Sequence, residues 1–137
     1  MYAAELSVNE PLREEVGAFR GPIYAECAGL LYLAKELDGV PMCGIVDAEA
    51  HMTDRLTLGY REAVAVRDSL VARAGERVRG HEFHRTVMRR GQGSEPAWQW
   101  SPDGPDGFTA RNLLASYLHL HWAGMPEMAT RFVGACA

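Results

Sequence analysis

The sequence has little of what marks several large protein classes. Its three cysteines, Cys27, Cys43 and Cys136, are an odd number without short paired spacings, which argues against a disulfide framework. No apolar run approaches the length that crosses a bilayer, and the early acidic residues do not fit a secretion signal. The net charge of −4 leaves no strong basic field for nucleic acid. We therefore expect a cytoplasmic protein that binds neither nucleic acid nor a membrane.

Glycine-rich loops that bind phosphate are absent as well. Neither G-x-x-x-x-G-K-[ST] nor G-x-G-x-x-G occurs, and Gly91-Gln92-Gly93 lacks the flanking strand and helix. We therefore expect no ATP binding and no cofactor in this domain. No carboxylate pair suited to a metal is evident either, because Asp103 and Asp106 belong to a strong turn signal and are interpreted as turn formers.

The composition fits one globular domain, since 47% of the 137 residues are hydrophobic and 23% are charged. The first third of the chain predicts a helix that Ser7 or Asn9 caps and that ends at Gly21-Pro22. The mostly apolar run at 22–26 then predicts a buried strand. A second helix is predicted at 29–37, where Asp38-Gly39 closes it.

The rest of the chain alternates between apolar and polar residues, which predicts strands. These strands are expected at 55–66, 79–88, 97–100 and 113–122, with a turn at 103–107 and a last helix at 125–135. The order predicts an α/β domain with a mixed sheet. Because such a domain usually opens with strands and this chain opens on a helix, we expect a fragment that lacks its first strands.

Cys27 lies where the predicted buried strand meets the predicted helix. A nucleophile at such a junction stands on a tight turn and needs small neighbours, which Ala25, Ala28 and Gly29 supply. The start of the helix is expected to favour the thiolate, and the Ala28 N–H to stabilise an oxyanion. The alternative is a buried and inert cysteine, since cysteine is among the most buried residue types.

His119 and His121 follow in the strand-like run 113–122, and alternation places both on the face of Tyr117. Either imidazole is suited to take the thiol proton of Cys27 and later protonate a leaving group. The pattern does not choose between them, and both could instead be ordinary histidines of a polar strand face.

His81 and His84 place two more histidines in one segment, on opposite sides if the segment is a strand. With His119, His121 and Cys27 they make a metal-binding protein a rival hypothesis. No Cys-x-x-Cys pair and no helical His-Glu-x-x-His supports that rival.

Three segments together resemble one family. They are Gly21 to Leu33 with the Ala-Glu-Cys motif, Gly80 to His84, and Ala115 to Trp122. The combination resembles the class I glutamine amidotransferase domain of cobyrinic and hydrogenobyrinic acid a,c-diamide synthases, which belong to cobalamin biosynthesis.

The resemblance implies a flavodoxin-like α/β fold and a glutaminase in which Cys27 is the nucleophile and His119 its base. His121 and Glu82 become possible accessory residues. In other class I amidotransferases a carboxylate stands two residues after the histidine, and here His121 holds that position. The family also usually has Gly where this chain has Ala28, and it carries a Gly-Gly-Tyr-Pro-Glu segment upstream that this sequence does not contain.

We therefore expect residues 1–137 to be an amidotransferase domain that is incomplete at its N-terminus, with glutamine as its substrate. The resemblance implies a synthetase domain elsewhere in the full enzyme, a ligase that uses ATP and Mg²⁺ to activate the a- and c-carboxylates of a corrinoid. Two alternatives stay open: a non-catalytic glutamine-binding or metal-binding module, and the corresponding domain of a cobyric acid synthase or a nickel-tetrapyrrole a,c-diamide synthase. Because the segment that supplies the second oxyanion donor in the family is not in this sequence, we do not expect full activity from this chain alone.

Overall fold

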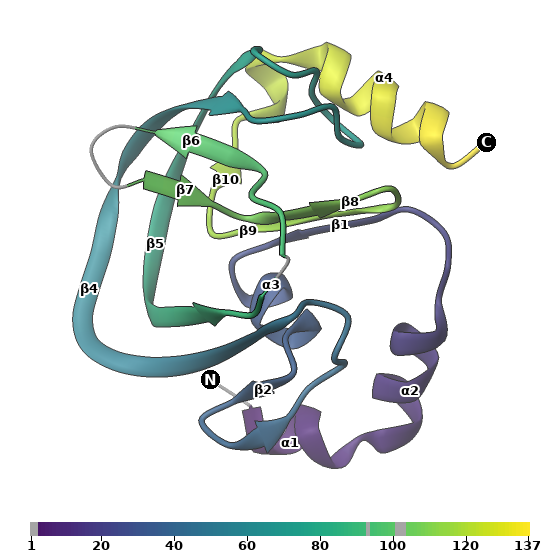
Figure 1. Ribbon diagram of the computed structural model, residues 1–137, viewed down its shortest axis with the longest axis vertical. Coiled ribbons are helices and arrows are strands. Elements are labelled where there is room, and N and C mark those ends of the chain that lie inside the picture. Colours follow the sequence, from purple (N-terminus) through teal and green to yellow (C-terminus); the bar gives the residue numbers. More distant parts are fainter. Residues whose placement is uncertain (1–2, 93, 101–103) are drawn as a thin grey trace.

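The computed structural model describes residues 3–92, 94–100 and 104–137 (Figure 1). The helices are α1 (Ala3–Val8), α2 (Glu10–Ala18), α3 (Ala28–Leu33) and α4 (Pro126–Ala135), with a short 3-10 helix η1 (Trp122–Gly124). The strands are β1 (Ile23–Glu26), β2 (Glu36–Leu37), β3 (Val40–Pro41), β4 (Ala48–Ala65), β5 (Arg77–Arg90), β6 (Trp98–Trp100), β7 (Gly104–Asp106), β8 (Phe108–Ala110), β9 (Leu113–Ser116) and β10 (His119–Leu120).

A small sheet of order β1-β9-β8 lies in the middle of the molecule, with α3 on one side and α4 on the other (Figure 1). Strand β1 runs parallel to β9, and β8 runs antiparallel to it. Alternate side chains of β1 enter two cores: Ala25 belongs to the core that includes Leu30 and Leu31 of α3, and Tyr24 packs against the other core, where its ring lies 6.2 Å from that of Phe132 of α4. Burial on both faces explains why this strand reads as an apolar run.

The second sheet has the order β10-β5-β4-β2-β3, with β6 attached to β4 and β7 attached to β6. The long β4 and β5 form an antiparallel pair whose register shifts between Met52 and Thr57. The alternating apolar residues of β4 lie on its exposed face, where Leu58 stands opposite Phe83 of β5. The mixed sheets and flanking helices confirm the predicted α/β class.

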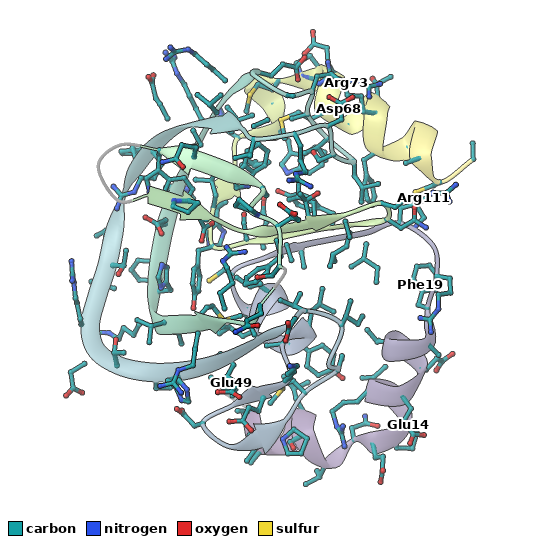
Figure 2. The ribbon with its side chains drawn as sticks, in the orientation of Figure 1. Glu14, Phe19, Glu49, Asp68, Arg73 and Arg111 are labelled. Atoms are coloured by element: carbon teal, nitrogen blue, oxygen red, sulfur yellow. The ribbon has the colours of Figure 1, made fainter. Side chains whose placement is uncertain are left out.

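The opening helix is confirmed, with Asn9 as its cap. The Asn9 side chain accepts a hydrogen bond from the Leu12 N–H at 3.3 Å, and Pro11 stands in the first turn of α2. Ser7 lies instead in the last turn of α1. Beyond α2 the chain passes Phe19, which points outward at the edge of the molecule (Figure 2).

The second helix is shorter than the sequence predicts. It ends at Leu33, and Glu36 and Leu37 form β2 beside β4. Backbone hydrogen bonds from Lys35 N to Ala48 O and from Asp38 N to Ala50 O, both 2.9 Å, hold this segment extended. Sheet pairing therefore outweighs the helix propensity of these residues.

Two further predictions need correction. The run 113–122 is not one strand: β9 ends at Ser116, and β10 begins at His119 in the other sheet. Asp106 does not form a turn, since it lies in β7 opposite Trp98 of β6; Asp103 lies outside the described residues. The last helix is confirmed as α4, and none of the helices in the described ranges combines the length and hydropathy that a membrane span requires.

Candidate active site

Cys27 stands on a strained turn between β1 and α3. Its φ is 49° and its ψ is −107°, and the only other described non-glycine residue with a positive φ is Asp38. The Cys27 N–H donates to the Ser116 carbonyl at 2.8 Å, which ties the turn to the end of β9. A side chain at Gly29 would meet the Cβ of Ala25 at 3.3 Å, so the turn requires small residues. Such strain persists where the surrounding structure enforces it, and it is frequent at nucleophile turns.

The thiol of Cys27 is not activated by its surroundings alone. Burial raises the pKa of the thiol; a hydrogen bond from the Ala28 N–H lowers it, and the Glu26 carboxylate raises it further. The N–H of Ala28 at the helix start therefore favours the thiolate, but burial outweighs it and the net pKa of the thiol lies above the ordinary value. The thiol therefore needs a base to take its proton.

A cavity of about 280 Å³ opens at Cys27, near the lower end of the roughly 300–1,000 Å³ usual for small-molecule sites. The residues that line it with Cys27 are Ala28, Leu31, Met52, Leu56, Phe83, His84, Arg85 and Thr86. The sulfur lies 3.7 Å from the Phe83 carbonyl oxygen. Strand β5, which contains the segment Gly80 to His84, therefore forms the wall opposite the nucleophile turn.

His119 lies at the start of β10, and it is partly exposed. Its Nδ1 is 3.8 Å from Oε2 of Glu26, the residue before Cys27. Its ring stacks on that of His81 at 4.7 Å, with 9° between the planes. Its Nε2 is buried and has no hydrogen-bond partner among the described residues. Nδ1 of His119 therefore lies beside a carboxylate, and Nε2 makes no hydrogen bond to the described residues.

His121 does not share that environment. It is exposed, its backbone N–H donates to Arg79 O at 3.1 Å, and it precedes η1. Because 113–122 is not one strand, the predicted common face of Tyr117, His119 and His121 does not form. Of the two histidines, only His119 lies beside Glu26, the residue that precedes Cys27.

His84 lines the Cys27 cavity, but both of its ring nitrogens are engaged. Nδ1 lies 2.9 Å from the Thr86 carbonyl, and Nε2 lies 3.2 Å from Oε1 of Glu82. Glu82 is also bound by Arg61 at 2.6 Å. Burial raises the pKa of Glu82, but the hydrogen bonds from His84 and Arg61 outweigh it, so its pKa lies below the usual value. Both ring nitrogens of His84 are thus occupied by partners within its own strand, whereas Nε2 of His119 has no partner among the described residues.

Glu82, predicted as an accessory residue, therefore acts on His84 and not on His119. His84 in turn stacks on the Tyr117 ring at 3.7 Å, with 8° between the planes. Within the described residues, no three His, Cys, Asp or Glu side chains converge on a point that could hold a metal ion.

The model of the CobB/CobQ-like glutamine amidotransferase domain matches residues 2–126. This chain belongs to that family.

The amidotransferase domain is similar to part of several curated proteins. Hydrogenobyrinate a,c-diamide synthase of Streptomyces coelicolor is 60% identical over 141 residues, which cover 99% of this chain and 29% of the relative. The synthase of that name from Mycobacterium tuberculosis is 48% identical over 143 residues (99% and 31%). Cobyrinate a,c-diamide synthase of Gloeobacter violaceus is 44% identical over 146 residues (99% and 32%). The domain thus spans about a third of the length of these relatives.

Solved structures share its fold. A crystal structure of a glutamine amidotransferase matches with a TM-score of 0.66 and 23% identity, over 98% of this chain and 70% of that chain. PurLQS from Thermotoga maritima matches with a TM-score of 0.64 and 9% identity, over 94% and 67%. The predicted amidotransferase fold is therefore confirmed.

A second cavity of about 370 Å³ shares His84 and Thr86 with the Cys27 cavity. Buried atoms at its wall lack a partner among the described residues: Thr86 Oγ1, Arg90 Nη1, Trp100 Nε1, Asp106 Oδ2 and Tyr117 OH. Burial raises the pKa of Asp106 to about 6. The second cavity thus has both a cationic and an anionic side chain in its wall, Arg90 and Asp106. No pattern in the sequence predicts this pair.

Proposed function

We propose that this domain hydrolyses glutamine, with Cys27 as the nucleophile and His119 as its base. The observation that carries the proposal is the strained turn, which holds Cys27 at the opening of a cavity and hydrogen-bonds to the end of β9. Strand β9 leads within three residues to His119. A free thiol, an open imidazole nitrogen and a cavity for the substrate are the parts that cysteine-based amide hydrolysis requires.

In the proposed reaction, Nε2 of His119 takes the proton of the Cys27 thiol. The thiolate attacks the carbonyl carbon of the glutamine side-chain amide, and the Ala28 N–H donates to the oxygen that becomes negative. The imidazolium returns its proton to the amide nitrogen as the carbon–nitrogen bond breaks and ammonia leaves. Water then hydrolyses the glutamyl thioester, which releases glutamate and restores the thiol.

We further infer that the ammonia serves an ATP- and Mg²⁺-dependent ligase that amidates the a- and c-carboxylates of a corrinoid. The support is the printed names of the relatives, since those at 48–60% identity are hydrogenobyrinate a,c-diamide synthases and the cobyrinate synthases match at 38–44%. Hydrogenobyrinic acid is therefore the preferred substrate in this proposal. None of the relatives named here is a cobyric acid synthase or acts on a nickel tetrapyrrole.

Glutamate release from glutamine tests the glutaminase. We expect Cys27→Ala and His119→Ala to release no glutamate. Cys136→Ala, which changes an exposed cysteine near the C-terminal end, should keep the wild-type rate. The measurement is made on this chain and on a version joined to the synthetase part of the relatives. Release by Cys27→Ala at the wild-type rate would overturn the proposal.

A second candidate is a module that binds glutamine without hydrolysing it. It is favoured by the raised pKa of Cys27 and by the sulfur's contact with the Phe83 carbonyl in place of the His119 ring. Calorimetric binding of glutamine with no glutamate formed, in both versions of the protein, would establish this candidate and exclude the first.

A further inference from the structure

The carboxylate nearest to His119 comes from the nucleophile strand. Glu26 is the last residue of β1, directly before Cys27, and its side chain is about a quarter exposed. His119 is 93 positions further along the chain, so only the fold brings the two together. The position two residues after His119 holds the exposed His121 and supplies no carboxylate.

Glu26 contacts both the backbone and the ring of the histidine segment. Its Oε1 accepts the Leu120 N–H at 2.9 Å and the Tyr24 hydroxyl, and its Oε2 lies 3.8 Å from Nδ1 of His119. The Tyr24 ring is itself packed edge-on against Trp122 at 4.9 Å. One oxygen of the carboxylate is therefore fixed by two donors, and the other is left for the imidazole.

On the other side, the His119 ring lies flat against His81 of β5. Stacking on one face and a carboxylate at Nδ1 leave the ring little freedom to turn. A carboxylate accepts and never donates, so it favours the tautomer that carries its proton on Nδ1. That tautomer leaves the lone pair on Nε2, the buried atom with no partner among the described residues.

We propose that Glu26 is the positioning residue of the site: it holds His119 with the proton on Nδ1, so that Nε2 can accept the proton of Cys27. This assignment rests on the glutaminase proposed above. Glu26, which precedes the nucleophile, thus takes the role of the carboxylate that other class I amidotransferases have two residues after the histidine. Its charge also stabilises the imidazolium that forms during the reaction, as the buried aspartate does in serine proteases.

The substitution Glu26→Gln isolates this role. The amide oxygen can still accept from the Leu120 N–H and the Tyr24 hydroxyl, so the local packing is kept. The amide NH₂ then takes the place of Oε2 and donates towards Nδ1 of His119, which favours the opposite tautomer. A proton on Nε2 prevents that atom from acting as a base.

Nitrogen-15 NMR of the histidine side chains measures the tautomer in this 137-residue chain without any need for turnover. We expect His119 to be protonated at Nδ1 in the wild type and at Nε2 in Glu26→Gln. A matched control is Glu62→Gln, which removes a carboxylate from an exposed ion pair with Arg79. Wild-type His119 protonated at Nε2, or a tautomer that Glu26→Gln leaves unchanged, would overturn the proposal.

The kinetics of glutamine hydrolysis provide a second test. We expect Glu26→Gln to lower kcat about a hundredfold with little change in KM, and Glu62→Gln to match the wild type. The expected loss is smaller than the roughly ten-thousandfold loss for the equivalent change in a serine protease, because the contact at 3.8 Å is longer than a hydrogen bond. If Cys27→Ala is inactive while Glu26→Gln keeps wild-type kcat, the role of Glu26 alone is wrong. If Cys27→Ala is active, the glutaminase itself is wrong.

Discussion

The backbone of Cys27 predicts an unusual response to glycine. At ordinary positions glycine is about 0.5–1 kcal/mol less stable than alanine, because it loses more conformational freedom on folding. Cys27, with φ at 49° and ψ at −107°, is in a region that a residue with a Cβ occupies at a cost of about 1–3 kcal/mol. Glycine removes that cost, so we expect the Cys27→Gly protein to be about 0.5–2 kcal/mol more stable than Cys27→Ala.

Both variants lose the sulfur, so the difference in their free energies of unfolding measures the effect of the single methyl group of alanine. Cys43 provides the matched pair: it is also a free, half-buried cysteine, and it is not among the residues with positive φ. There we expect Cys43→Ala to be the more stable variant by about 0.5–1 kcal/mol. The sign of the glycine-to-alanine difference is thus opposite at the two cysteines.

Urea unfolding followed by tryptophan fluorescence measures the four free energies, with equal slopes as the condition for comparing them. Activity is not needed, which separates this test from those of the glutaminase. If Cys27→Ala proves more stable than Cys27→Gly by the margin seen at Cys43, the turn is unstrained and the interpretation of Cys27 as a held nucleophile loses its physical basis.

Three more predictions concern packing and charge around the site. Gly80→Ala should lower glutaminase activity and destabilise the fold by about 1–3 kcal/mol, because the new Cβ would lie 2.2 Å from the His119 backbone oxygen; Gly134→Ala, with open space around it, is the control, and both are compared by urea unfolding and glutamate release. The pKa of Asp106 in the folded protein is raised to about 6, so its ionisation destabilises the wild type as pH rises from 4 to 8. Asp106→Asn cannot ionise, so we expect its free energy of unfolding relative to the wild type to rise by about 1–3 kcal/mol over that interval. Urea unfolding at both pH values measures the difference. Leu118→Ala, which empties a fully buried site, should cost about 2–5 kcal/mol in the same unfolding assay.

Local signals were sufficient for the nucleophile turn and the long strands. An apolar run buried on both faces, followed by small residues, predicts β1 and the turn at Cys27. Alternation at 55–66 and 79–88 predicts most of β4 and β5, although β4 begins earlier, at Ala48. These patterns depend on neighbours in sequence, so a single sequence contains them.

The errors arise where distant parts of the chain decide the local structure. Leu37 pairs with Ala50 of β4 and leaves the helix that its propensity favours. Ser116 ends β9 early because its hydroxyl accepts from the Leu118 N–H at 3.2 Å and from Trp98 Nε1 at 3.2 Å. Neither partnership is visible before the sheets assemble.

In the candidate site, too, the residues fixed by local sequence were predictable and those fixed by distant contacts were not. Cys27 was predictable from its junction, whereas the choice of His119 came from the resemblance, since alternation placed His121 on the same face. Glu26 was missed because its partners are the Leu120 N–H and the His119 ring, more than 90 positions away. The one available signal was its place in the Ala-Glu-Cys motif, next to the nucleophile.

The central claim is that Cys27 attacks a glutamine side chain in the cavity beside it. A diazo-ketone analogue of glutamine, which alkylates a thiol that attacks it, tests that claim when labelled peptides are identified by mass spectrometry. We predict one adduct, on Cys27, with Cys43 and Cys136 unlabelled and with labelling slowed by glutamine. Labelling of the three cysteines in proportion to their exposure, or an unmodified Cys27, would contradict it.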